Sequence, residues 1–128
     1  HSFANRMGSH WPGLSTAHLR LLGTSGTVTT LGSLYLDLAA YDRSQVDGLH
    51  VAATDFSDIC ARLAGLSLEQ RQQLPCIGRE RADLVVAGCA VLEEIMAIWP
   101  ATHIDVADRG IREGVLRQMM HSHAGAGA

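Results

Sequence analysis

The chain has 128 residues, of which 47% are apolar and 18% charged, and this composition suits one compact globular domain. Its formal net charge of −3 comes from ten arginines against thirteen carboxylates, with no lysine at any position. The sequence therefore excludes a Walker-type phosphate lysine, a Schiff-base lysine and a kinase-type lysine–glutamate pair, and a bound anion would have to meet arginine, backbone N–H groups or hydroxyls.

The N-terminal part of the chain predicts a strand, a glycine turn and a helix. The first eighteen residues mix glycine, proline, serine and three histidines without an apolar period, so we expect a loop or a frayed helix end over 1–18. The alternating run HLRLL then predicts a short buried strand that begins near Leu19. A turn over Gly23–Thr27 follows. From Val28 onward, apolar residues at helical spacing predict a helix (Leu31, Leu34, Tyr35 and Leu38).

The middle of the chain predicts a second strand followed by two helices. The run VDGLHV, over 46–51, reads as a short strand, and Thr54 is a plausible N-cap for the helix after it. Gly65 should end that helix, whose buried face we expect to hold Phe56, Ile59, Cys60 and Leu63. Ser67 and Gln70 form a capping-box signature for a second short helix, which Pro75 should stop.

The C-terminal part predicts a long helix, a third strand and a last helix. We expect the long helix over 81–99, with Gly88 at a point where a neighbour packs closely. Its apolar side should hold Leu84, Val91, Ile95 and Ile98. The run THIDVAD, over 102–108, alternates like a strand, and GIREGVLRQMM predicts a helix packed through Ile111, Val115, Leu116 and Met119. We expect a disordered tail over 121–128, so that the folded part spans 19–120.

Strands separated by helices predict an α/β fold, helix-rich, with a short sheet that includes some parallel pairing. Three short strands make a thin sheet, so we expect them to be part of a larger one. An unpaired edge would favour pairing with another copy, which predicts a homo-oligomer. The three cysteines, Cys60, Cys76 and Cys89, have no CxxC pairing and indicate reduced thiols in or near the core. No apolar run is long enough to span a membrane, and we expect a cytoplasmic protein.

Two interpretations of the glycine turn remain open. Because Gly23 and Gly26 lack Cβ atoms, a phosphate could approach the backbone and the helix N-terminus, with hydroxyls supplied by Thr24, Ser25 and Thr27. The structural alternative is an ordinary strand-to-helix corner in which the glycines supply unusual φ values and Thr27 or a neighbour caps the helix.

Two further clusters have the same ambiguity. Arg81 could bind an anion through its rigid guanidinium fork, or it could join Arg79, Glu80 and Asp83 in a solvated ion-pair cluster. Asp108 follows a predicted strand, where carboxylates often line ligand crevices. It is a secondary candidate, because it could instead cap the last helix and pair with a neighbouring arginine (Arg109 or Arg112).

The histidines do not predict a metal site. Most of them fall near the two ends of the chain, at positions 1, 10, 18, 121 and 123, and none forms a convincing ligand pair, so we expect no bound metal. Nucleic-acid binding is also not indicated, because the ten arginines are dispersed and the net charge is negative.

Several motifs, taken in order, resemble the Ppx/GppA phosphatases. These are GTSGTVTTL, YDRSQVDG, LSLEQRQQLP, RADLVVAG and DRGIREG, and they run from about Leu19 to Leu116. The resemblance implies the second ribonuclease-H-like domain of the superfamily that includes actin, sugar kinases and heat-shock ATPases. A sugar-kinase-like or heat-shock-like ATPase fits the glycine loop but not the last two motifs.

The resemblance also implies a function. Gly23–Thr27 would lie beside the ligand cleft between two domains, and Arg81 would reach anionic phosphate in it. The parent protein would hydrolyse the terminal phosphate of polyphosphate or guanosine pentaphosphate, the latter a stringent-response nucleotide, with magnesium. The family's phosphate loop and catalytic glutamate have no match here, so we expect a C-terminal fragment that is inactive alone and partners a missing N-terminal domain. The alternative is a stand-alone module that binds nucleotide, polyphosphate or a protein without catalysis.

Overall fold

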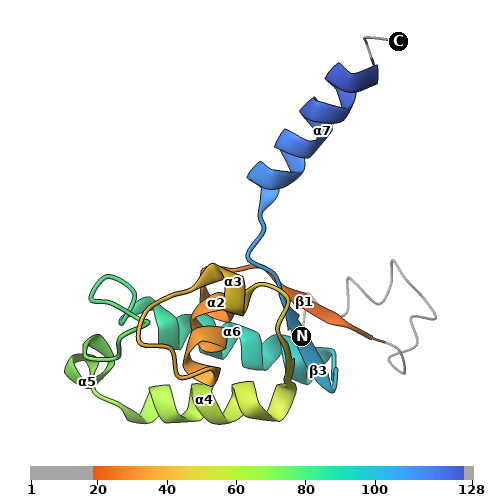
Figure 1. Cartoon of the computed structure of the whole chain (residues 1–128). Helices are drawn as coiled ribbons and strands as arrows, with labels where there is room; N and C mark the ends of the chain where they lie inside the picture. The colour runs from red at the N-terminus through yellow and green to blue at the C-terminus, as the bar shows by residue number, and fades with distance from the viewer. Residues whose placement is uncertain (1–18, 126–128) are drawn as a thin grey trace.

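The computed structural model describes residues 19–125, and it describes side chains over residues 19–122 (Figure 1). The expected loop over 1–18 and its histidines lie outside this range. The described elements in chain order are β1 (Leu21–Gly23), α2 (Gly26–Tyr35), α3 (Arg43–Val46), β2 (His50–Ala52), α4 (Ala53–Gly65), α5 (Leu68–Gln72), α6 (Leu84–Ile98), β3 (His103–Val106) and α7 (Ile111–Gly125).

The three strands form one mixed sheet in the order β1-β3-β2. β1 runs parallel to β3, with Leu21 opposite Ile104, and β2 runs antiparallel to β3, with Val51 opposite the same Ile104. The strand that comes last in the chain therefore lies in the centre. This arrangement confirms the expected α/β fold with a short sheet and some parallel pairing.

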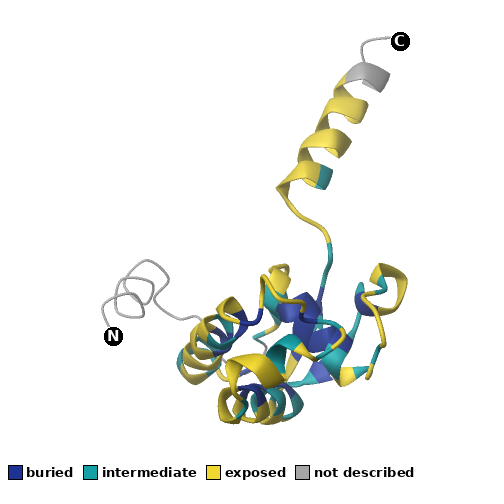
Figure 2. Ribbon diagram, turned by 90° about the vertical axis from the view of Figure 1, so that its left-hand side faces the viewer, coloured by how far each residue is buried: buried dark blue, intermediate teal, exposed yellow. Residues whose placement is uncertain are grey.

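The core lies between the sheet and the helices α2, α4 and α6, which pack beside one another (Figure 1). Leu31 of α2, Phe56 and Leu63 of α4, and Ile104 of β3 are fully or almost fully buried there. The alternation predicted for the third strand is observed, since Ile104 and Val106 are buried while Asp105 between them is partly exposed. Figure 2 shows the buried residues gathered inside this body.

The helix starts differ from expectation in two places. Thr54 is not an N-cap, because β2 runs directly into α4 and the helix already begins at Ala53. α6 begins at Leu84 rather than at residue 81, which leaves Arg81 in the turn before it. The capping box of Ser67 and Gln70 is confirmed.

The apolar face predicted for the long helix is wrong at Leu84 and Val91, whereas Ile95 and Ile98 are half-buried. The buried residues of α6 are Val85, Cys89 and Leu92, whereas Leu84 and Val91 are 69% and 61% exposed. Nearly every residue of the first half of this helix is apolar, so two adjacent faces satisfy the same helical spacing. The sequence pattern alone does not distinguish the face that packs on α4 from the one beside it.

The last helix is not packed as expected. α7 projects away from the body in both Figure 1 and Figure 2, and Ile111, Val115, Leu116 and Met119 are exposed. It also continues past His121, where we expected a disordered tail, to Gly125. None of the helices that the structure describes is long and apolar enough to cross a bilayer.

Candidate functional site

The glycine turn forms the junction between β1 and α2. Ser25 has extended backbone angles, φ −86° and ψ 159°, and its hydroxyl accepts the N–H of Val28 at 3.4 Å, so this residue is the N-cap of α2. The N–H groups of Gly26 and Thr27 have no acceptor among the described residues. No acidic residue lies in the first turn. The positive end of the helix is therefore open toward the solvent.

The two glycines of the turn have different roles. A Cβ on Gly23 would lie 2.6 Å from a methyl carbon of Val28, so a side chain here would collide with the core. A Cβ on Gly26 would lie 3.7 Å from the Arg81 guanidinium, which is ordinary contact. Neither glycine has a positive φ, so the interpretation that they supply unusual backbone angles is wrong. Gly23 permits packing, and Gly26 faces Arg81.

Several hydroxyls of α2 are already used within the helix. Thr29 and Thr30 both donate to the carbonyl of Gly26, at 3.2 Å and 2.7 Å. Thr27 instead packs against α6 at Gly88, where a Cβ would lie only 2.2 Å from the Thr27 hydroxyl oxygen. This confirms the close approach expected at Gly88. Thr24 and Ser25 are exposed at the surface of the turn.

Arg81 lies beside the start of α2. Its carbonyl accepts the N–H groups of Leu84 and Val85 and so begins α6. Its guanidinium is exposed and makes no ion pair or hydrogen bond with another described residue. The alternative ion-pair cluster does not form, because Arg79, Glu80 and Asp83 also make no ion pair within residues 19–122.

Arg81 and the glycine turn share a cavity of about 280 Å³. The residues that line it are Gly26, Thr27, Thr30, Arg81, Leu84 and Val85. No carboxylate is among them, so Arg81 and the first turn of α2 line the same space without a negative charge.

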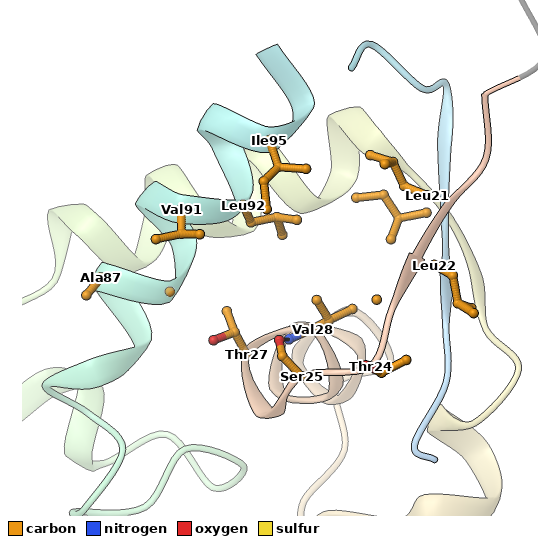
Figure 3. Close-up of a pocket in the computed structure, with 13 residues that line it drawn as sticks. Leu21, Leu22, Thr24, Ser25, Thr27, Val28, Ala87, Val91, Leu92 and Ile95 are labelled. Carbon is orange, nitrogen blue, oxygen red and sulfur yellow. Dashed lines mark hydrogen bonds between the residues drawn. The ribbon is translucent and has the colours of Figure 1, made fainter. Parts of the chain in front are cut away.

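A larger apolar groove lies on the other side of Thr27. It has a volume of about 520 Å³ and runs between β1 and α6, with the first residues of α2 at its floor (Figure 3). Leu21 lines it from the strand, and Val91, Leu92 and Ile95 line it from the helix, whereas the side chain of Leu22 points away from it. Among the lining residues, only Thr24, Ser25 and Thr27 have polar side chains.

Asp108 lies near the turn but not in the Arg81 cavity. Its carboxylate accepts a hydrogen bond from the Tyr41 hydroxyl and pairs with Arg43 at 3.3 Å. The expectation that it caps the last helix and pairs with Arg109 or Arg112 is wrong, because α7 begins at Ile111 and Arg109 pairs with Asp47 at 3.1 Å. Asp108 and Thr24 instead line a separate cavity of about 600 Å³.

The contacts of Asp108 and its neighbours connect two segments that are distant in the chain, residues 41–47 and 108–113. The Asp108 N–H donates to the Asp47 carboxylate at 2.9 Å, and Arg43 also lies 3.6 Å from Glu113. Burial and the Asp108 carboxylate raise the pKa of Tyr41 to about 12, so its hydroxyl stays protonated as a donor. Sequence reasoning missed this network. Its members lie in YDRSQVDG and DRGIREG, but nothing in either motif predicts that the two segments meet.

Comparison with known proteins identifies the family. The model of the Ppx/GppA phosphatase family matches residues 12–123. The chain is similar to exopolyphosphatase 2 of Mycobacterium tuberculosis, with 35% identity over 88 residues, which cover 66% of this chain and 28% of that protein. The chain therefore spans well under half the length of this curated relative.

Solved structures share the fold. A Ppx/GppA family member from Aquifex aeolicus superposes with a TM-score of 0.78 at 22% identity, covering 95% of this chain and 40% of the other. An exopolyphosphatase from Cytophaga hutchinsonii gives 0.72 at 18% identity, covering 94% and 41%. These matches confirm the expected fold, which is that of Ppx/GppA family structures. The family match, the relative and the fold agree, and the chain belongs to the Ppx/GppA phosphatase family.

Proposed function

We propose that this chain supplies one wall of the phosphate-binding cleft of a phosphatase that releases the terminal phosphate of polyphosphate or guanosine pentaphosphate. The observation that carries the proposal is the cavity between α2 and the turn before α6. There, an unpaired Arg81 guanidinium lines one space together with Gly26 and Thr27, whose N–H groups have no acceptor among the described residues, and no carboxylate is in its lining.

This arrangement suits a phosphate group. The guanidinium fork can donate to two phosphate oxygens and stays charged at any physiological pH. The N–H groups at the start of α2 point along the helix axis and add the positive end of the helix dipole. Thr30 also lines the space, but its hydroxyl is occupied by the Gly26 carbonyl. The chain would therefore bind phosphate through one side chain and two backbone groups.

The remainder of the active site would come from a longer parent chain. The described residues do not fit a magnesium site in this cavity, because no carboxylate lines it and no group of three His, Cys, Asp or Glu side chains in the described range could hold a metal. We therefore assign phosphate binding alone to these residues. The base and any metal belong, in this proposal, to the missing N-terminal domain, and the 128-residue chain binds without hydrolysis.

The test compares Arg81→Ala with a matched control, Arg79→Ala, in the longest chain that can be produced. Arg79 is also an exposed, unpaired arginine of the same turn, but it does not line the cavity. Loss of a charge-assisted hydrogen bond to phosphate should lower kcat/KM for phosphate release by about 10- to 100-fold in Arg81→Ala only. Both polyphosphate and guanosine pentaphosphate should be assayed.

The 128-residue chain gives a second readout. Tripolyphosphate titrated into it should shift the amide NMR signals of Gly26 and Thr27, and Arg81→Ala should weaken that binding. Equal turnover and equal binding in the Arg81 and Arg79 variants would exclude Arg81 from the site. Binding without any turnover in a longer chain would favour the alternative of a stand-alone binding module.

A further inference from the structure

Arg71 is a half-buried arginine that makes no ion pair within residues 19–122. Its guanidinium donates instead to three backbone carbonyls. The Nε atom donates to the carbonyl of Ala82 at 3.0 Å, in the turn before α6. The Nη1 atom donates to the carbonyls of Leu63 and Leu66, at 3.2 Å and 2.7 Å, where α4 ends. One side chain therefore connects the end of α4 to the turn before α6.

The two bonds to α4 have an ordinary structural explanation. The capping box of Ser67 and Gln70 fixes the start of α5, and Arg71 lies in the last turn of this short helix. The last carbonyls of a helix have no donor within the helix and carry the negative end of its dipole, so a cation beside the end of α4 is favourable. This explanation does not cover the third bond, which goes to a different segment.

The third bond acts on the turn that carries Arg81. Ala82 is fully buried, so its carbonyl needs a donor inside the protein, and Arg71 supplies one. The carbonyl of Arg81, one residue earlier, accepts the N–H groups of Leu84 and Val85. Because each peptide unit is planar, holding these two successive carbonyls fixes the backbone that follows Arg81. The turn is thus held by α6 on one side and by Arg71 on the other.

The place of the Arg81 guanidinium depends on this turn. Its Nη1 atom lies 3.7 Å from where a Cβ on Gly26 would be, so the side chain reaches the first turn of α2. The guanidinium has no ion pair or hydrogen bond within residues 19–122, so its position follows from that of its backbone. Arg71 is not among the residues that line the Arg81 cavity. It would therefore act on a bound anion through Arg81 and not by contact.

We propose that Arg71 is a positioning residue for the phosphate site. By holding the Ala82 carbonyl, it keeps Arg81 beside the first turn of α2, where both can meet one phosphate group. The inference rests on the proposed function, because it assumes that Arg81 binds phosphate. The alternative is that Arg71 only stabilises the end of α4, and the test has to separate the two roles.

The test measures the dissociation constant of tripolyphosphate for the 128-residue chain by NMR titration, which follows binding into the millimolar range. Arg71→Gln should weaken binding by about threefold to tenfold, because Arg81 loses its fixed position. Arg62→Gln is the matched control and should leave the constant unchanged. It removes the same charge from the last turn of α4, at an exposed arginine that makes no ion pair within residues 19–122 and does not line the cavity.

Arg71→Lys is a milder second variant. Its ammonium keeps the charge at the end of α4, but it lacks the guanidinium fork that reaches Ala82 and the α4 carbonyls together. Binding should weaken in the same direction as for Arg71→Gln. Circular dichroism checks that each variant is folded, and Arg71→Lys carries the comparison if Arg71→Gln is not.

A double-mutant cycle separates positioning from stabilisation. In an Arg81→Ala chain, the same change at Arg71 should alter the constant by less than about twofold, because the residue that it positions is gone. Equal weakening with and without Arg81 would overturn the inference and assign Arg71 a structural role alone. Binding as strong in Arg71→Gln as in Arg62→Gln would also overturn it, while an effect of Arg81→Ala would still support the phosphate site. If Arg81→Ala alone left binding unchanged, the proposed phosphate site would be excluded, and this inference with it.

Discussion

Gly88 determines how closely α6 can approach α2. A Cβ at this position would lie 2.2 Å from the Thr27 hydroxyl oxygen and 2.8 Å from its methyl carbon. Real Cβ atoms do not tolerate such distances, so the two helices would have to separate. Because Thr27 also lines both the Arg81 cavity and the apolar groove, this one contact fixes the geometry between them.

We predict that Gly88→Ala destabilises the chain by about 1–3 kcal/mol, because overpacking outweighs the better helix propensity of alanine. Urea denaturation followed by circular dichroism measures the effect. The control is Gly114→Ala in α7, where nothing lies within 4 Å, and this change should be neutral or slightly stabilising. Adding Thr27→Ala to Gly88→Ala should restore much of the lost stability. If Gly88→Ala were as stable as wild type, the close approach of the two helices would be wrong.

At the same scale, the sequence predicted some site residues and not others. The close packing at Gly88 and the capping box at Ser67 follow from local rules, and both were found. The role of Asp108 was assigned to the wrong partners, because Tyr41 and Arg43 are distant in the chain and only the fold brings them together. The proposed role of Arg81 came from the family motif, since spacing alone favoured a solvated cluster.

At the scale of elements, Asp105 connects all three strands on the outer face of the sheet. Its carboxylate accepts from Arg20, just before β1, at 2.7 Å, and it contacts His50 of β2 at the same distance. The His50 ring in turn stacks on that of His103, with centroids 4.4 Å apart. These hydrogen bonds, first that of His50 and then that of Arg20, lower the pKa of Asp105.

A lowered pKa predicts the sign of a pH effect. The carboxylate stabilises the fold above its unfolded pKa of about 3.9, and this contribution is lost as the pH falls through the depressed folded value. We predict that Asp105→Asn lowers the free energy of unfolding at pH 7 by up to about 1 kcal/mol. Urea melts at several pH values should show a smaller acid-induced loss for the variant than for wild type. Parallel curves would contradict the assignment. Asp58→Asn serves as control, because Asp58 is exposed on α4 and makes no ion pair within residues 19–122.

The elements themselves were largely predictable, and their faces were not. Strand alternation identified β3, and helical spacing identified the buried face of α4 through Phe56, Cys60 and Leu63. In α6 the apolar residues surround much of the helix, so a periodic pattern fits more than one face. In α7 the apolar residues that were expected to pack are exposed, because helical spacing alone does not show which surface, if any, covers a helix.

At the scale of the whole molecule, the buried interior is confined to the body formed by the sheet and the helices α2, α4 and α6, while α7 lies outside it (Figure 2). The resemblance in motif order predicted this fold, and the structural matches confirm it. What the sequence did not predict is that the strand predicted last would lie between the other two. Pairing partners depend on the tertiary arrangement rather than on local pattern.

Hydrogen exchange should reveal the same division. At high dilution we predict strong protection for α4 and β3, which are packed in the core, and exchange near the unprotected rate for α7. Mass spectrometry of peptic fragments measures this. Protection of α7 as strong as that of α4 would contradict the exposed position of α7.

The central place of β3 also bears on how the protein is made. A ribosome releases β1 and β2 long before β3, and neither early strand pairs with the other. The nascent polypeptide can form its helices as they emerge. The backbone N–H and C=O groups of β1 and β2 that pair with β3 have no partner until His103–Val106 has been synthesised. Synthesis that stalls before that point would leave an aggregation-prone intermediate with unpaired strand edges, which chaperones would bind.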